Sequence, residues 1–84
     1  MMEMQQQRLA AWDEVDDFLT SAPTLRQILD YRPSEESQAR VRELLQMNRD
    51  GTLSSAETAE LDDYLALENF MRHLKIKALA KLQK

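Results

Sequence analysis

The last third of the chain, from Ser54 to Lys84, contains neither proline nor glycine. Because these two residues are the strongest helix breakers, the stretch predicts a single helix of about 29 residues, roughly 43 Å long at 1.5 Å per residue. Ser54 and Glu57 have the spacing of a capping box, which is typical of a helix start. The alternative is a helix that breaks or frays near residue 72 and folds back.

Three shorter helices are predicted before the long one. Their expected spans are residues 3–20, 24–32 and 34–50. Pro23 and Pro33 separate them, since proline and the residue before it disfavour a continuing helix, and Gly51 is placed to end the third in the left-handed conformation. A length of 84 residues with 43% hydrophobic residues suits one small all-α domain over residues 1–84, with three short helices and one long C-terminal helix.

The predicted long helix has more apolar surface than a small core requires. One strip, expected to face the first and third helices, contains Tyr64, Leu67, Met71 and Leu74. A second strip contains Leu61, Leu65, Ile76 and Leu79, with Glu68 and Lys75 as flanking charges. Together the strips exceed the arc of about 100° that docking on a single core uses. We therefore expect Leu65, Ile76 and Leu79 to face outward and to bind a second copy of the chain or a different protein.

Charge is divided unevenly along the chain. Residues 1–71 carry all 15 acidic residues and six arginines, a net charge of −9, whereas residues 72–84 carry five cations and no anion. Lys77 and Lys81 lie on one side of the long helix in this basic segment. Two interpretations remain, namely that the cations complement the helix dipole or that they contact an acidic partner or phosphates. Aromatic residues for base stacking are not interleaved with them, which argues against nucleic-acid binding.

The run from Gln46 to Glu57 also has two interpretations. Aligned on Gly51, it has the spacing of a calcium-binding loop. The remaining ligand positions would be Asn48, Asp50, Thr52, Ser54 and Glu57. Gln46 stands where the first acidic ligand is expected, and the same residues are explained by a helix end at Gly51 and a helix start at Ser54. The second interpretation is favoured, and a degenerate calcium-responsive helix–loop–helix is the alternative function.

Catalytic chemistry is not indicated by the composition. The chain has no cysteine and His73 is its only histidine, so it lacks the side chains for most nucleophile–base pairs and zinc sites. We expect no enzyme activity, no catalytic residue, no cofactor and no bound metal. No apolar run approaches the roughly 20 residues that span a bilayer, and no secretory signal is recognised. These features predict a cytoplasmic protein without a membrane segment.

Three stretches carry a resemblance to a known family. They are Leu-Leu-Gln-Met-Asn-Arg-Asp-Gly-Thr-Leu-Ser-Ser-Ala-Glu, Glu-Leu-Asp-Asp-Tyr and Phe-Met-Arg-His-Leu-Lys-Ile-Lys-Ala. Together with similar segments upstream, over about residues 15–81, they resemble a family of small uncharacterised bacterial proteins common in cyanobacteria, with the pattern LLxxNRxGxLTxEExxELDxYxxLxxLMRxLKAxA. In that family the first calcium-ligand position is not acidic, which argues further against a calcium site.

The resemblance implies a partner role. Such genes look like the small upstream member of two-gene modules, some with nuclease-like or toxin-like neighbours, and no catalytic residue is carried over. The sequence thus predicts a non-enzymatic protein–protein interaction module, antitoxin-like or an accessory subunit, that forms a homodimer or binds a heterologous protein. The predicted partner-binding residues are Leu65, Ile76, Leu79, Lys77 and Lys81.

Overall fold

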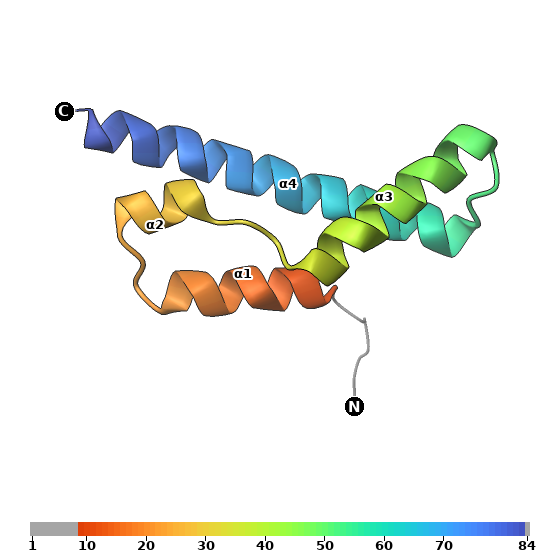
Figure 1. Ribbon diagram of the computed structural model, residues 1–84, viewed down its shortest axis with the longest axis horizontal. Helices are drawn as coiled ribbons and strands as arrows, with labels where there is room; N and C mark the ends of the chain where they lie inside the picture. The colour runs from red at the N-terminus through yellow and green to blue at the C-terminus, as the bar shows by residue number, and fades with distance from the viewer. Residues whose placement is uncertain (1–8, 84) are drawn as a thin grey trace.

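Four helices make up the computed structural model, which describes residues 9–83 (Figure 1). Their bounds are α1 Ala10–Thr20, α2 Leu25–Asp30, α3 Glu35–Asp50 and α4 Ser55–Leu82. No strand occurs within this part of the chain. The prediction of an all-α fold with three short helices and one long C-terminal helix is confirmed.

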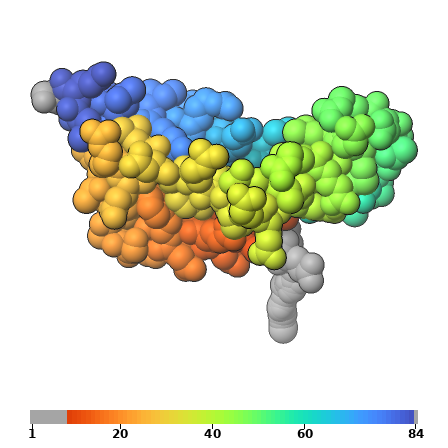
Figure 2. Space-filling view, viewed as in Figure 1, coloured from red at the N-terminus to blue at the C-terminus, as the bar shows by residue number. Residues whose placement is uncertain are grey.

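Helix α4 is continuous over 28 residues. At 1.5 Å per residue it is about 42 Å long, so the alternative of a break near residue 72 is wrong. Helices α1 and α2 lie beside its C-terminal half, and α3 crosses nearer its start (Figure 1). Figure 2 shows the tip of the α3–α4 hairpin projecting to one side of this body. The radius of gyration is 15.1 Å, above the roughly 12 Å of a compact chain of this length.

Hydrogen bonds at the helix starts follow the predicted caps. At α2, the Gln27 amide donates to Thr24 Oγ1 at 3.1 Å and the Thr24 amide donates to Gln27 Oε1 at 2.8 Å. At α4, the Ser54 and Glu57 side chains make the same reciprocal pair at 3.0 and 2.9 Å. Each pair is a capping box that satisfies two amides without a partner within the helix, and the pair at Ser54 confirms the predicted start of the long helix.

Gly51 ends α3 in the left-handed conformation, with φ 71° and ψ 27°. The Thr52 amide donates to the Met47 carbonyl at 2.9 Å, and the Gly51 amide donates to the Asn48 carbonyl at 3.2 Å. This pair of bonds is the Schellman arrangement, which satisfies carbonyls left over at the end of the helix. The predicted helix end at Gly51 is confirmed.

The start of the first helix differs from the prediction. Leu9 is extended, with ψ 141°, and α1 begins at Ala10 without a side-chain cap. The predicted start near Glu3 lies outside the described residues. Leu9 packs against the hydrophobic core although its backbone is extended rather than helical.

The central core joins α1 to α4. Ala11 and Val15 of α1 are buried against Leu67 and Met71 of α4. The partly buried residues around them are Leu9, Trp12, Leu19, Tyr31, Tyr64 and Leu74. The predicted inward strip of α4 therefore does face α1.

The same strip meets α3 at Tyr64, whose hydroxyl lies within hydrogen-bonding reach of the Ser37 side chain. Helix α3 meets α4 nearer its start, where Leu44 and Leu61 are buried outside the central cluster. Helix α2 packs along α4 more extensively than α3 does. The tilt of α3 across α4, seen in Figure 1, explains the difference, because a crossing helix meets only a short stretch of its neighbour.

Trp12 lies at the edge of the core. Its indole N–H donates to Asp63 Oδ1 at 3.0 Å, and its ring is 6.0 Å from the ring of Phe70. A buried indole needs an acceptor, and at the core edge Trp12 finds one in Asp63 while its ring covers Val15 and its neighbours.

Substitution of Gly51 tests the helix end. No atom lies within 4 Å of a Cβ built on Gly51, so a side chain there meets strain only through its positive φ. We expect Gly51→Val to lower the free energy of unfolding by roughly 1–2 kcal/mol. Gly51→Asn, which tolerates the left-handed conformation, should lose less. Urea unfolding of the three proteins is the measurement, and equal stabilities would contradict the assigned conformation.

Ala22 has φ 60° in the turn after α1, which is uncommon for a residue with a side chain. Ala22→Gly removes the left-handed penalty and should raise the free energy of unfolding by about 0.5 kcal/mol, net of the entropy that glycine adds to the unfolded chain. The matched control is Ala66→Gly on the exposed face of α4, which should lower it by about 1 kcal/mol. If both variants raise the free energy of unfolding, or both lower it, the left-handed conformation of Ala22 is refuted.

Candidate functional site

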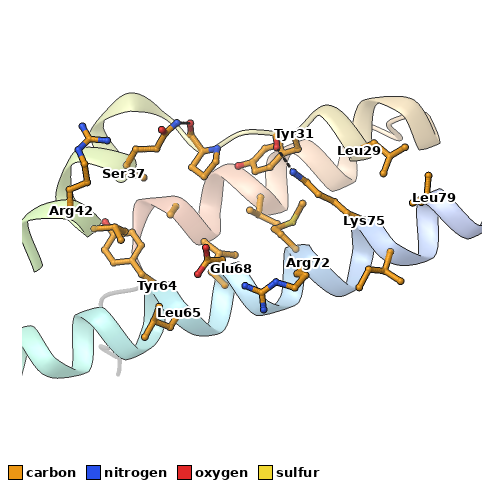
Figure 3. A pocket seen from close by; sticks show the side chains of 18 residues that line it. Leu29, Tyr31, Ser37, Arg42, Tyr64, Leu65, Glu68, Arg72, Lys75 and Leu79 are labelled. Carbon is orange, nitrogen blue, oxygen red and sulfur yellow. Dashed lines mark hydrogen bonds between the residues drawn. The ribbon is translucent and has the colours of Figure 1, made fainter. Parts of the chain in front are cut away.

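An apolar groove of about 680 Å³ lies between α4 and the α2–α3 connection, with α1 beneath it (Figure 3). The floor of the groove is the outer side of the core, contributed by Ala11 and Val15 of α1 and by Leu67 and Met71 of α4. The floor of the groove is therefore the central core itself.

Two walls border the floor. The α4 wall contains Leu65, Glu68, Arg72, Ile76 and Leu79. The opposite wall contains Leu29, Tyr31, Pro33, Ser37, Gln38, Val41 and Arg42. Figure 3 shows labelled side chains of both rows along the two sides of the groove. The lining is mainly apolar, and its charges lie along the rim.

Lys75 holds the α2 side of the groove against α4. Its Nζ donates to the Tyr31 carbonyl oxygen at 2.7 Å, at the C-terminal end of α2. A cation is favourable there because helix carbonyls leave partial negative charge at that end. The Tyr31 ring lies 4.7 Å from the Phe18 ring of α1, and burial raises the pKa of its hydroxyl, with the carboxylate of Glu14 adding to the shift. The wall is thereby tied to both α1 and α4.

Arg40 and Glu60 hold the α3 side. Arg40 Nε donates to Glu60 Oε2 at 2.8 Å and its Nη2 donates to Glu60 Oε1 at 2.7 Å, a two-pronged pair between α3 and α4. Arg40 Nη1 also donates to Glu43 at 2.7 Å. These hydrogen bonds lower the pKa of Glu60 and raise that of Arg40. The geometry is specific because the guanidinium fork matches a carboxylate.

Buried polar groups lie behind the same wall. Ser37 is buried, and its amide donates to Ser34 Oγ at 3.2 Å, while Ser34 Oγ donates in turn to Ser37 Oγ at 3.2 Å. Burial raises the pKa of the neighbouring Tyr64 hydroxyl, and the negative charge of Glu60 raises it further. Satisfied polar groups of this kind fix the position of α3 at the groove.

Three of the five predicted partner-binding residues come together in the structure. Leu65, Ile76 and Leu79 share the α4 wall and are 43%, 60% and 46% exposed. Lys77 and Lys81 are exposed but do not line the groove. At 100° per residue they lie on a different side of α4, so the predicted set divides into an apolar part at the groove and a basic part away from it.

The opposite wall was not predicted from the sequence. Leu29, Tyr31 and Val41 of this wall are half-buried at the groove, and Tyr31 also packs against the central core. Lys75, interpreted as a charge flanking the outward strip, instead binds the Tyr31 carbonyl. Helical spacing carries no information on the contact between Lys75 and a carbonyl 44 positions earlier in the chain.

The residues of the calcium-loop interpretation have other partners. Gln46, Asn48 and Asp50 belong to α3, and Gln46 Nε2 donates to Asp50 Oδ1 at 3.1 Å. Ser54 and Glu57 are engaged with each other at the start of α4. Within residues 9–83, no three His, Cys, Asp or Glu side chains are grouped in a way that would hold a metal ion.

The chemistry of the groove is mainly that of an apolar contact surface. Its lining provides aliphatic and aromatic carbon with a few charges at the rim, and the one histidine, His73, is exposed and outside it. Among the helices of residues 9–83, none combines the length and the apolar character that crossing a bilayer requires.

No protein-family model matches this chain, and neither a curated protein nor a solved structure matches it significantly. Functional inference therefore rests on the groove and on the residues that form it.

The pair of Arg40 and Glu60 makes stability depend on pH. Because the folded-state pKa of Glu60 is lowered, its contribution is complete above its ordinary value of 4.5 and is lost as the pH falls through the lowered pKa. We expect the parent to be more stable than Glu60→Gln at neutral pH and the two to converge in acid. Thermal unfolding of both proteins across this range is the measurement. A constant difference would show that ionised Glu60 does not stabilise the fold.

Proposed function

We propose that this chain is a non-enzymatic protein–protein interaction module that self-associates as a dimer through α4 and the groove beside it. The observation that carries the proposal is the α4 wall, where Leu65, Ile76 and Leu79 are 43%, 60% and 46% exposed on one face of the helix beside the groove. Single exposed leucines are ordinary, but an apolar row continuous with a groove is typical of a protein contact surface.

The shape of the chain supports the same proposal. Helix α4 is about 42 Å long, and α1 and α2 cover only one side of its C-terminal half. The radius of gyration of 15.1 Å indicates that the four helices do not close into a compact globule. A second protein surface against α4 would bury side chains that the chain cannot cover with its own helices.

The resemblance to small bacterial proteins encoded in two-gene modules makes an antitoxin-like or accessory role our proposal for the biological context, in the cytoplasm. The same surface then serves for self-association or for a heterologous protein partner. The continuous helical conformation of Gln46, Asn48 and Asp50 supports this proposal over the calcium-responsive alternative, because a calcium loop takes its early ligands from non-helical backbone.

Removal of apolar side chains from the α4 wall tests the function. The parent should sediment as a dimer over a range of concentrations, and Ile76→Ser with Leu79→Ser should give a helical chain of monomer mass. Both side chains are largely exposed, so their loss should cost the monomer little stability.

The matched control is Lys77→Ser with Lys81→Ser, which changes two exposed residues of α4 outside the groove. This variant should keep the dimer mass. A parent that remains monomeric at the highest concentration would refute self-association and would leave a different protein as the partner.

A further inference from the structure

We propose that the groove-side face of α4 pairs with α4 of a second copy in the antiparallel direction, about a two-fold axis near the middle of the helix. This inference rests on the self-association proposed above and adds its direction and register. It follows from the order of apolar and charged residues along one face of α4.

That face is made of five residues spaced three or four apart, so they form one row along the helix. In chain order they are Leu65, Glu68, Arg72, Ile76 and Leu79, and all of them line the groove. The row is apolar at both ends and charged in the middle, with an anion followed by a cation. Such an order distinguishes between the two possible directions of a partner helix.

In a parallel pair, each residue faces its own copy. Glu68 would then lie against Glu68 of the second copy and Arg72 against Arg72, and like charges in register are unfavourable. In an antiparallel pair, Glu68 lies against Arg72 of the second copy, and the reverse contact follows from the two-fold symmetry. The same register places Leu65 beside Ile76 and Leu79 of the second copy, as a knob in a hole.

The charged residues at the middle of the row are available for this contact. Glu68 is the one carboxylate that lines the groove, and within residues 9–83 it has no hydrogen bond or ion pair. Arg72 donates only to the Asn69 side chain at 3.1 Å and is exposed. On α4, Lys75 is already bound to the Tyr31 carbonyl, so Arg72 is the cation of this row that can meet an incoming carboxylate.

The same charges favour a second copy over a different protein. An acidic helix of another protein would satisfy Arg72 but would leave Glu68 facing an apolar or acidic surface. A second copy supplies a cation for Glu68 and an anion for Arg72, and its row has the same apolar ends. The face is thus complementary to itself when it is reversed.

Disulfide trapping tests the direction, because the chain has no cysteine of its own. Leu65→Cys and Ile76→Cys are made as separate variants, both at exposed positions, and each is checked for parental helicity and dimer mass. Positions 65 and 76 are about 16 Å apart along one helix, whereas a disulfide needs Cα atoms within about 7 Å. An equimolar mixture of the two variants is then oxidised beside each variant alone, and the products are identified by mass.

The antiparallel register predicts a disulfide between position 65 of one copy and position 76 of the other. It should form about tenfold faster in the mixture than the symmetric disulfide of either variant alone. The matched control is Ala66→Cys, exposed and outside the groove, which sets the rate of random collision in a mixture with Ile76→Cys. Symmetric disulfides at rates above this control would indicate a parallel pair and would overturn the proposal.

Failure of this inference is distinguishable from failure of the proposed function. A dimer that shows no preference for the mixed disulfide overturns the antiparallel register and leaves self-association standing. A parent chain of monomer mass overturns both, because then no second copy occupies the groove at all.

Discussion

The length of α4 is the constraint on which the other features depend. Its 28 residues follow one another without a helix breaker, so the chain has a rod of about 42 Å on which three much shorter helices must pack. Helices α1 and α2 contain 11 and 6 residues and cover one side of its C-terminal half, and α3 crosses nearer its start. The groove is the space that these short helices leave beside the rod. An exposed apolar wall is therefore a consequence of unequal helix lengths.

Polar contacts act together with apolar packing to keep the two sides of the groove in place. Lys75 donates to the Tyr31 carbonyl at the C-terminal end of α2, and Glu60 accepts from the guanidinium of Arg40 on α3. Lys75 and Glu60 both lie on α4 near the groove. The opposite wall is therefore tied to α4 at its α2 end and at its α3 end. Packing alone would favour closure over the apolar floor formed by Val15 and Met71. The hydrogen bonds of Lys75 and Glu60 instead keep the two walls at a fixed separation, because hydrogen bonds weaken when the helices shift from their preferred distance and angle.

Local sequence determines the elements of this fold well, and it determines their contacts poorly. The caps at Thr24, Ser54 and Gly51 were predictable because each acts within a few residues of itself. The outward direction of Leu65, Ile76 and Leu79 was predictable from helical period alone. The opposite wall was not, because it depends on how α3 tilts across α4 and on Lys75 reaching a distant carbonyl. Lys77 and Lys81 were predicted to bind a partner because of the basic charge of their segment, and 100° per residue places them on a side of α4 away from the apolar residues.

The open groove also connects binding with folding. Its floor is the core itself, so Val15 and Met71 are buried by their neighbours but lie directly beneath the surface that a partner would cover. A partner that packs on Leu65 and Ile76 would exclude water from the same cluster that joins α1 to α4. Binding to the folded chain alone stabilises it in proportion to the logarithm of partner concentration. A small domain with a thin margin of stability would gain from such binding, because a partner on this surface would complete its core.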